Sequence, residues 1–114
     1  MSVQGVTIFL ESKNIENTAN FYTKVFEFHD YKSFNDEVIR LNISYYTIII
    51  QKTEIPNKTS FGLDIKDTTS LMQRIEDYGN IKFKESNPYD SAHGEFVIYD
   101  VDGNDITLVN YNYK

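Results

Sequence analysis

The chain has 114 residues, and its 17 Asp and Glu against 11 Lys and Arg give a formal net charge of −6 at pH 7. This length suits one domain, and 40% hydrophobic with 15% aromatic residues is typical of a folded chain rather than a disordered one. The acid excess argues against nucleic-acid binding, and the absence of cysteine excludes disulfides and thiolate metal ligands. No apolar run is long enough for a membrane span and no signal-peptide pattern is present, so we expect a cytoplasmic protein.

The first half of the chain predicts a strand, a helix and three more strands. Residues 3–10 (VQGVTIFL) are rich in β-branched and aromatic side chains, which favours a strand. Ser12 or Asn14 can then cap a helix that runs to Phe26. Further strands are predicted over residues 28–34, 37–43 and 45–52, and the polar segment 53–59 is predicted to be a connector.

The second half repeats this order. A strand is predicted over residues 60–65, followed by a helix that Asp67 caps and Gly79 ends. The remaining strands are predicted over residues 81–84, 95–99 and 105–111, with a tight turn over residues 100–104. Calcium binding by this turn is not expected, because Gly103 is fourth in the turn and an EF-hand loop needs its glycine sixth.

The two halves match at an offset of 55 residues. The matched pairs are Val6 with Phe61, Ile8 with Leu63, Leu10 with Ile65, and Ser12 with Asp67. This repeat predicts an α+β fold in which one domain is built from two tandem βαβββ modules, residues 1–53 and 60–114. Each helix covers one sheet face only, so two adjacent modules would form a curved, partly open, barrel-like sheet with an inner cleft.

Two motifs carry a resemblance to a known family. The segments FYTKVFEF (residues 21–28) and DVDGNDITLV (residues 100–109) resemble the FYxxVLGF and DPDGNxIEL patterns of the vicinal oxygen chelate superfamily. That superfamily includes glyoxalase I, extradiol dioxygenases, and bleomycin- and fosfomycin-resistance proteins. The resemblance spans essentially the whole chain, with Glu27 in place of the usual glycine and Val101 in place of the usual proline.

The resemblance also implies where metal ligands would stand, on the first and last strands of each module. In this sequence these places fall on Gly5, Ile49, Ser60 and Thr107. Glycine and isoleucine offer no ligand atom, and neutral Ser and Thr are poor ligands for divalent ions. We therefore predict no metal and no cofactor, and we expect no catalytic role for His29 or His93, the only two histidines.

Strand alternation predicts which side chains face the cleft, if Gly5, Ser60 and Thr107 mark that face. The predicted ligand-binding residues are Phe9, Glu11, Arg40, Tyr45, Asp64, Glu95, Tyr99 and Tyr111. Aromatic rings with carboxylates suit a flat or cationic organic molecule. The alternative is that these rings fill the core or an interface between subunits.

The favoured function is metal-independent, non-catalytic binding of a small organic molecule, similar to the bleomycin-resistance proteins, in a homodimer as the resemblance implies. A first alternative is a glyoxalase- or dioxygenase-like metalloenzyme with a non-standard site, in which Glu95 or Asp64 would join His93. A second alternative is a structural or regulatory dimer without an open cleft. These alternatives stay open at the level of the sequence.

Overall fold

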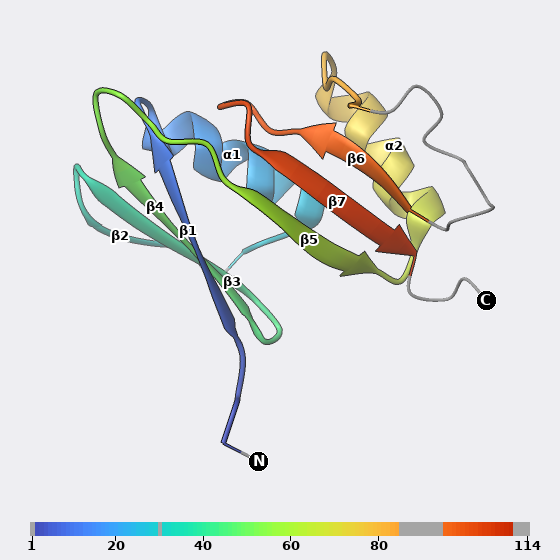
Figure 1. Ribbon diagram of the computed structural model, residues 1–114, viewed down its shortest axis with the longest axis horizontal. Coiled ribbons are helices and arrows are strands. Elements are labelled where there is room, and N and C mark those ends of the chain that lie inside the picture. Colours follow the sequence, from blue (N-terminus) through green and yellow to red (C-terminus); the bar gives the residue numbers. More distant parts are fainter. Residues whose placement is uncertain (1, 30, 85–94, 111–114) are drawn as a thin grey trace. The chain divides into compact units, whose positions relative to one another are not determined.

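The computed structural model describes residues 2–29, 31–84 and 95–110 (Figure 1). It divides into two compact units, Met1–Lys58 and Thr59–Lys114. We call them unit 1 and unit 2 and describe each by itself. Neither sheet closes on itself among the described residues, and the α+β fold with one helix and one mixed sheet per unit is confirmed.

The described residues of unit 1 form one helix and four strands. They are β1 (Val6–Ser12), α1 (Ile15–Phe26), β2 (Lys32–Asn35), β3 (Val38–Ile43) and β4 (Tyr46–Lys52). The strand order is β1-β4-β3-β2, with β1 parallel to β4 and the other pairs antiparallel. The βαβββ module predicted for the first half is therefore present.

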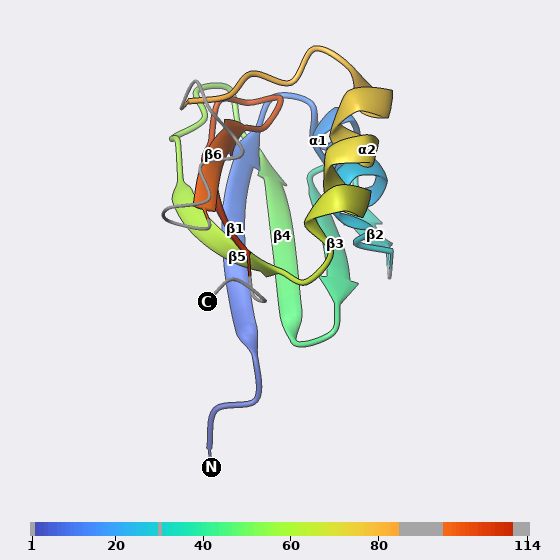
Figure 2. The same cartoon turned by 90° about the vertical axis from the view of Figure 1, so that its right-hand side faces the viewer.

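Helix α1 packs on strands β1, β3 and β4 and covers one face of this sheet (Figure 2). The side chains of the sheet that are buried on this face are Ile8, Leu10, Ile39, Leu41, Ile48 and Ile50. The opposing helix side chains are mostly aromatic or aliphatic, and Phe21, Tyr22 and Val25 are fully buried. Alternation along each strand therefore sends every second side chain to the uncovered face.

The structure defines both ends of α1 and corrects the strand predicted after it. Asn14 is the N-cap, and its side chain accepts a hydrogen bond of 3.1 Å from the Asn17 N–H. Glu27 ends the helix in the left-handed region, at φ 64° and ψ 29°, where the resembled family has glycine. The Phe28 N–H then donates to the Tyr22 carbonyl at 3.3 Å, so Phe28 completes the helix end. The strand predicted from residue 28 is thus wrong at its start, and β2 begins at Lys32.

Unit 2 contains β5 (Ser60–Ile65), α2 (Thr68–Tyr78), β6 (Glu95–Tyr99) and β7 (Asp105–Asn110). The strand order is β5-β7-β6, with β5 parallel to β7. The strand predicted over residues 81–84 is reduced to one antiparallel bridge between Phe83 and Ile98. Asp67 caps α2 as predicted, through a 3.0 Å hydrogen bond from the Ser70 N–H.

The turn over residues 100–104 is held by a buried carboxylate. Asp100 Oδ1 accepts from the N–H groups of Asp102 (2.8 Å) and Asn104 (3.0 Å), and Asp100 Oδ2 accepts from Asn104 Nδ2 at 2.8 Å. Asn104 Oδ1 accepts from the Thr59 N–H at 2.7 Å, which fastens the turn to the start of β5. The DVDGN motif is therefore a structural turn, as predicted, and its Asp and Asn join the turn to the start of β5.

Candidate functional site

Each sheet has one face that its own helix leaves uncovered, which we call its open face. In unit 1 the strand register forms three rows across β1, β4 and β3: Thr7–Thr47–Asn42, Phe9–Ile49–Arg40 and Glu11–Gln51–Val38. In unit 2 the rows across β5, β7 and β6 are Ser60–Asp105–Tyr99, Gly62–Thr107–Val97 and Asp64–Val109–Glu95. The alternation predicted from the sequence agrees with these rows.

Two aromatic side chains of unit 1 are strongly exposed. Phe9 on β1 has 67% of its surface exposed, and Tyr45, just before β4, has 74% exposed. Tyr45 also lines a pocket of about 590 Å³ together with Val3, Gln4 and Gly5. Both rings are accessible for stacking within the described structure.

The carboxylate of Glu11 is less available to a ligand than we expected from the sequence. Its Oε1 accepts a hydrogen bond of 2.8 Å from the Asn57 N–H, in the connector after β4. This carboxylate therefore helps to hold the connector against β1. Its role in ligand binding stays a prediction, and the hydrogen bond means that a ligand would have to share or displace this partner.

Arg40 lies beside a ring that the sequence analysis did not single out. Its guanidinium carbon is 5.7 Å from the centroid of the Phe34 ring, and Lys32 Nζ lies 5.3 Å from the same centroid. Lys32 and Phe34 belong to β2, and Lys32 pairs with Arg40 in the register. The strand predicted over residues 28–34 already contained Lys32 and Phe34. The sequence could not give the register of this strand against β3, which is irregular between Ser33 and Asn35.

The open face of unit 2 carries acidic residues. Asp64 is exposed, and the register places Glu95 in the same row as Asp64. Tyr99 is half-buried and pairs with Asp105. Tyr111 and His93, both named by the sequence analysis, lie outside the described residues, and His29 is exposed with its backbone N–H bonded to the Asn42 carbonyl at 3.2 Å.

The pKa of Asp105 is set by two neighbours on unit 2. A hydrogen bond from the Ser60 side chain, followed by the hydrogen bond and charge of Lys84, holds the pKa of Asp105 below its ordinary value of 3.8. Lys84 Nζ lies 3.1 Å from Asp105 Oδ2. Since the folded-state pKa is depressed, the stabilisation by ionised Asp105 is present above the unfolded-state pKa. It is lost as the pH falls through the lower folded-state value.

Replacing Ser60 by alanine is expected to raise the pKa of Asp105 towards its ordinary value, because the largest cause of the shift is removed. Carbon-detected NMR titration of the Asp105 carboxyl measures this directly. A matched Ser33→Ala variant on β2 of unit 1 should leave that titration unchanged. An Asp105 pKa that is the same in Ser60→Ala and the wild type contradicts this assignment.

The four places at which the resemblance implies metal ligands do not offer a matching donor set. A Cβ built on Gly5 would lie 2.5 Å from the Tyr45 carbonyl oxygen, so this backbone has no room for a ligating side chain there. Thr107 pairs with Gly62, and the equivalent pair in unit 1 is Thr47 with Thr7, so the register favours Thr47 over Ile49 for the fourth place. No group of three or more His, Cys, Asp or Glu that could hold a metal occurs among the described residues.

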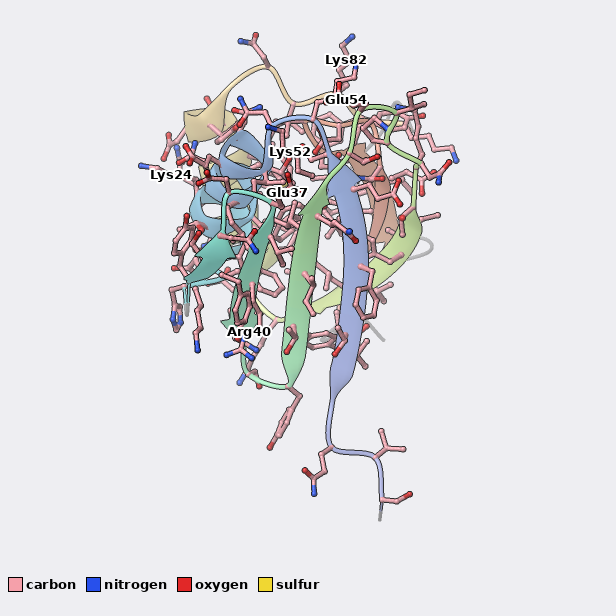
Figure 3. All side chains as sticks on the ribbon, turned by 90° about the vertical axis from the view of Figure 1, so that its left-hand side faces the viewer. Lys24, Glu37, Arg40, Lys52, Glu54 and Lys82 are labelled. Atoms are coloured by element: carbon pink, nitrogen blue, oxygen red, sulfur yellow. The ribbon has the colours of Figure 1, made fainter. Side chains whose placement is uncertain are left out.

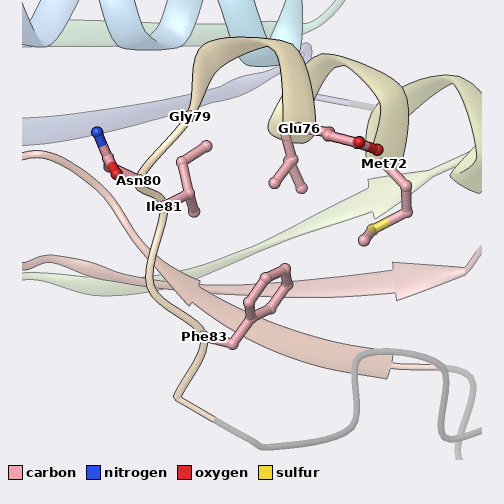
Figure 4. A pocket seen from close by; sticks show the side chains of 7 residues that line it. Met72, Glu76, Gly79, Asn80, Ile81 and Phe83 are labelled. Carbon is pink, nitrogen blue, oxygen red and sulfur yellow. The ribbon is translucent and has the colours of Figure 1, made fainter.

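A second pocket, of about 340 Å³, lies on unit 2 beside α2 and the segment that follows it (Figure 4). Its lining is Met72, Ile75, Glu76, Gly79, Asn80, Ile81 and Phe83. None of the predicted ligand-binding residues that the structure describes belongs to it. The described walls are mainly aliphatic and aromatic, and Glu76 is the one ionisable side chain among them.

Comparison with solved structures gives matches over nearly the whole chain. The bleomycin-binding protein of Streptomyces verticillus, complexed with copper(II)-bleomycin, has a TM-score of 0.70 at 16% identity and covers 96% of this chain and 98% of its own. The fosfomycin resistance protein FosX of Listeria monocytogenes has a TM-score of 0.74 at 19% identity, covering 96% and 92%. Lactoylglutathione lyase of Agrobacterium tumefaciens has a TM-score of 0.70 at 13% identity, covering 90% of each chain.

No protein-family model and no curated protein matches the sequence. The described helices are also too short and too polar to cross a membrane. At these levels of identity the structural matches establish the fold alone, which is the fold that the two sequence motifs led us to expect. The chain therefore has the fold of the vicinal oxygen chelate superfamily.

Proposed function

We propose that this protein binds a small aromatic organic molecule on its open sheet faces, without a metal and without transforming it. The observation that carries the proposal is the exposure of two rings of unit 1, Phe9 on the open face and Tyr45, which lines the pocket at Gly5. Large exposed rings beside a concavity favour ligand binding over a purely structural role. The solved bleomycin-binding protein, complexed with copper(II)-bleomycin, supports the proposal by analogy of fold.

The donor set supports the metal-independent form of the proposal. Gly5, Ser60 and Thr107 supply at most neutral hydroxyl groups, whereas divalent ions favour several charged or imidazole ligands that converge on one point. Elemental analysis of protein purified without a chelator separates this from the metalloenzyme alternative. Stoichiometric Zn, Ni, Mn or Fe would overturn the metal-independent form and favour the enzyme.

A preference for cationic ligands is the part of the proposal that rests on unit 2. Asp64 is exposed on the open face, and neither a hydrogen bond nor an ion pair engages it in the described structure. A homodimer in the cytoplasm stays part of the same proposal.

The Asp64→Asn variant is expected to weaken binding of 2-naphthylmethylammonium about threefold, the range of an exposed ion pair, and to leave neutral 2-naphthylmethanol unaffected. Isothermal titration calorimetry measures both affinities. Asp36→Asn, which removes the same charge from an exposed turn of unit 1, is the control and should change neither. Equal loss for the two probes, or none, would show that Asp64 does not select charge.

A further inference from the structure

Arg40 makes neither a hydrogen bond nor an ion pair with its side chain in the described structure. The guanidinium belongs to a half-buried side chain on β3, and its Nε atom is buried and has no hydrogen-bond partner. No carboxylate pairs with it in the described structure, although the chain has 17 acidic residues. An unmet donor makes the placement of this charged group costly, so an acceptor that reaches the terminal nitrogens of the half-buried guanidinium would be favoured.

A second cation stands beside the first. Lys32 Nζ and the Arg40 guanidinium contact the same Phe34 ring, at 5.3 and 5.7 Å from its centroid. The ring attracts each cation weakly, but the two like charges repel each other. A negative group between them would relieve the repulsion and accept hydrogen bonds from the terminal nitrogens of the guanidinium.

The corresponding place in unit 2 has the opposite charge. Arg40 pairs with Ile49, which pairs with Phe9, and the equivalent row of unit 2 is Glu95–Val109–Asp64. The repeat therefore preserves the apolar middle of the row and changes both ends. Unit 1 has an aromatic ring and a guanidinium where unit 2 has two acids, so the two open faces differ in the ligands that they favour.

We infer that the open face of unit 1 binds the carboxylate of an aromatic acid through Arg40. This rests on the proposed function and adds the chemical class of a ligand to it. Neighbouring strands are about 4.8 Å apart, so Arg40 and Phe9, two strands apart with Ile49 between them, are separated by about 10 Å. In this arrangement the fused ring system of the ligand lies over Ile49, with one edge against Phe9. The carboxylate of the ligand then accepts hydrogen bonds from the planar guanidinium group of Arg40.

Three probes that share the naphthalene ring but differ in charge test the inference. They are the anion 2-naphthoate, the neutral 2-naphthylmethanol and the cation 2-naphthylmethylammonium. With the wild-type protein, we expect 2-naphthoate to bind about tenfold more tightly than the alcohol, because a charge-assisted hydrogen bond in a partly buried place contributes that much. If none of the three binds, the proposed function fails and the inference with it. If the alcohol binds as well as 2-naphthoate, only the inference is overturned.

The Arg40→Met variant separates the guanidinium from the rest of the face. It should lose the preference for 2-naphthoate, so that acid and alcohol bind within about twofold of each other. Lys52→Met is the matched control, because it removes the same charge from an exposed residue at the end of β4, well apart from Arg40 in Figure 3. It should keep the tenfold preference.

Arg40→Lys keeps the positive charge but loses the paired N–H groups of the guanidinium. Its preference for 2-naphthoate over the alcohol should therefore be intermediate. It serves as the second variant if Arg40→Met fails to fold. Circular dichroism establishes that each variant is folded. A folded Arg40→Met protein, or failing that an Arg40→Lys protein, that keeps the full preference for 2-naphthoate overturns the inference.

Discussion

The Asp100→Ala variant is expected to lose about 3 kcal/mol of its free energy of unfolding, the largest effect predicted here for one side chain. The carboxylate is buried and accepts three hydrogen bonds of 2.8 to 3.0 Å, two from Asn104 and one from Asp102. Alanine leaves these donors without an acceptor and also frees Asn104, whose Oδ1 holds the Thr59 N–H. The turn and the start of β5 are therefore weakened together.

Urea unfolding followed by circular dichroism measures the loss. Asp36→Ala is the matched control, since Asp36 is an exposed turn aspartate between β2 and β3 and should cost less than about 0.5 kcal/mol. Asn104→Ala should fall between the two, because it keeps the bonds of Asp100 with the backbone N–H groups of the turn. If Asp100→Ala were no less stable than Asp36→Ala, the turn would not depend on this carboxylate.

The Gly5→Ala variant is expected to lose about 2 kcal/mol of its free energy of unfolding. Its Cβ would lie 2.5 Å from the Tyr45 carbonyl oxygen, and that atom belongs to the backbone, so no flexible side chain can move aside. The same carbonyl accepts a 2.9 Å hydrogen bond from the Val6 N–H at the start of β1. Relief of the clash would therefore break the first bond between β1 and β4.

Gly62→Ala is the control for this effect, and chemical unfolding of both variants gives the comparison. The Cβ built on Gly62 meets the Thr107 carbonyl at 3.4 Å, which a small shift relieves, so we expect a change of less than about 1 kcal/mol. Gly5→His should be destabilised at least as much as Gly5→Ala and should not gain stoichiometric zinc. Equal stability of Gly5→Ala and Gly62→Ala would contradict the close approach.

The fold was predictable because its two helices and most of its strands have strong local signals. Alternating apolar residues marked β1 and β5, and caps such as Asp67 marked the helices. The two wrongly predicted elements are the third element of each unit, namely the strand expected from residue 28 and the strand expected over residues 81–84. Every residue of β2 is exposed, and the segment around Phe83 makes a single β-bridge. Neither segment places alternate side chains in the core, so neither has the alternating apolar pattern that marks a strand in the sequence.

For the candidate site, the sequence could predict only which side chains of a strand share one face of the sheet. Alternation placed Phe9 and Arg40 on one face, which the register shows, because side chains of a strand alternate with period two. Alternation could not show that Asn57 engages Glu11, or that Lys84 reaches Asp105, because these pairs are far apart in the sequence. It also could not show that Lys32 and Arg40 share the Phe34 ring, since that depends on the register of β2 against β3, which shifts between Ser33 and Asn35.

The parallel pairing of first and last strands has a consequence for folding. In each unit the strand made first lies beside the strand made last, with Val6 opposite Tyr46 and Ser60 opposite Asp105. Such non-local pairs close slowly, so we expect the step that joins them to limit the folding rate of each unit. All described pairings of unit 1 lie within residues that precede unit 2. During synthesis the first half therefore has every strand of its sheet before the second half has been made.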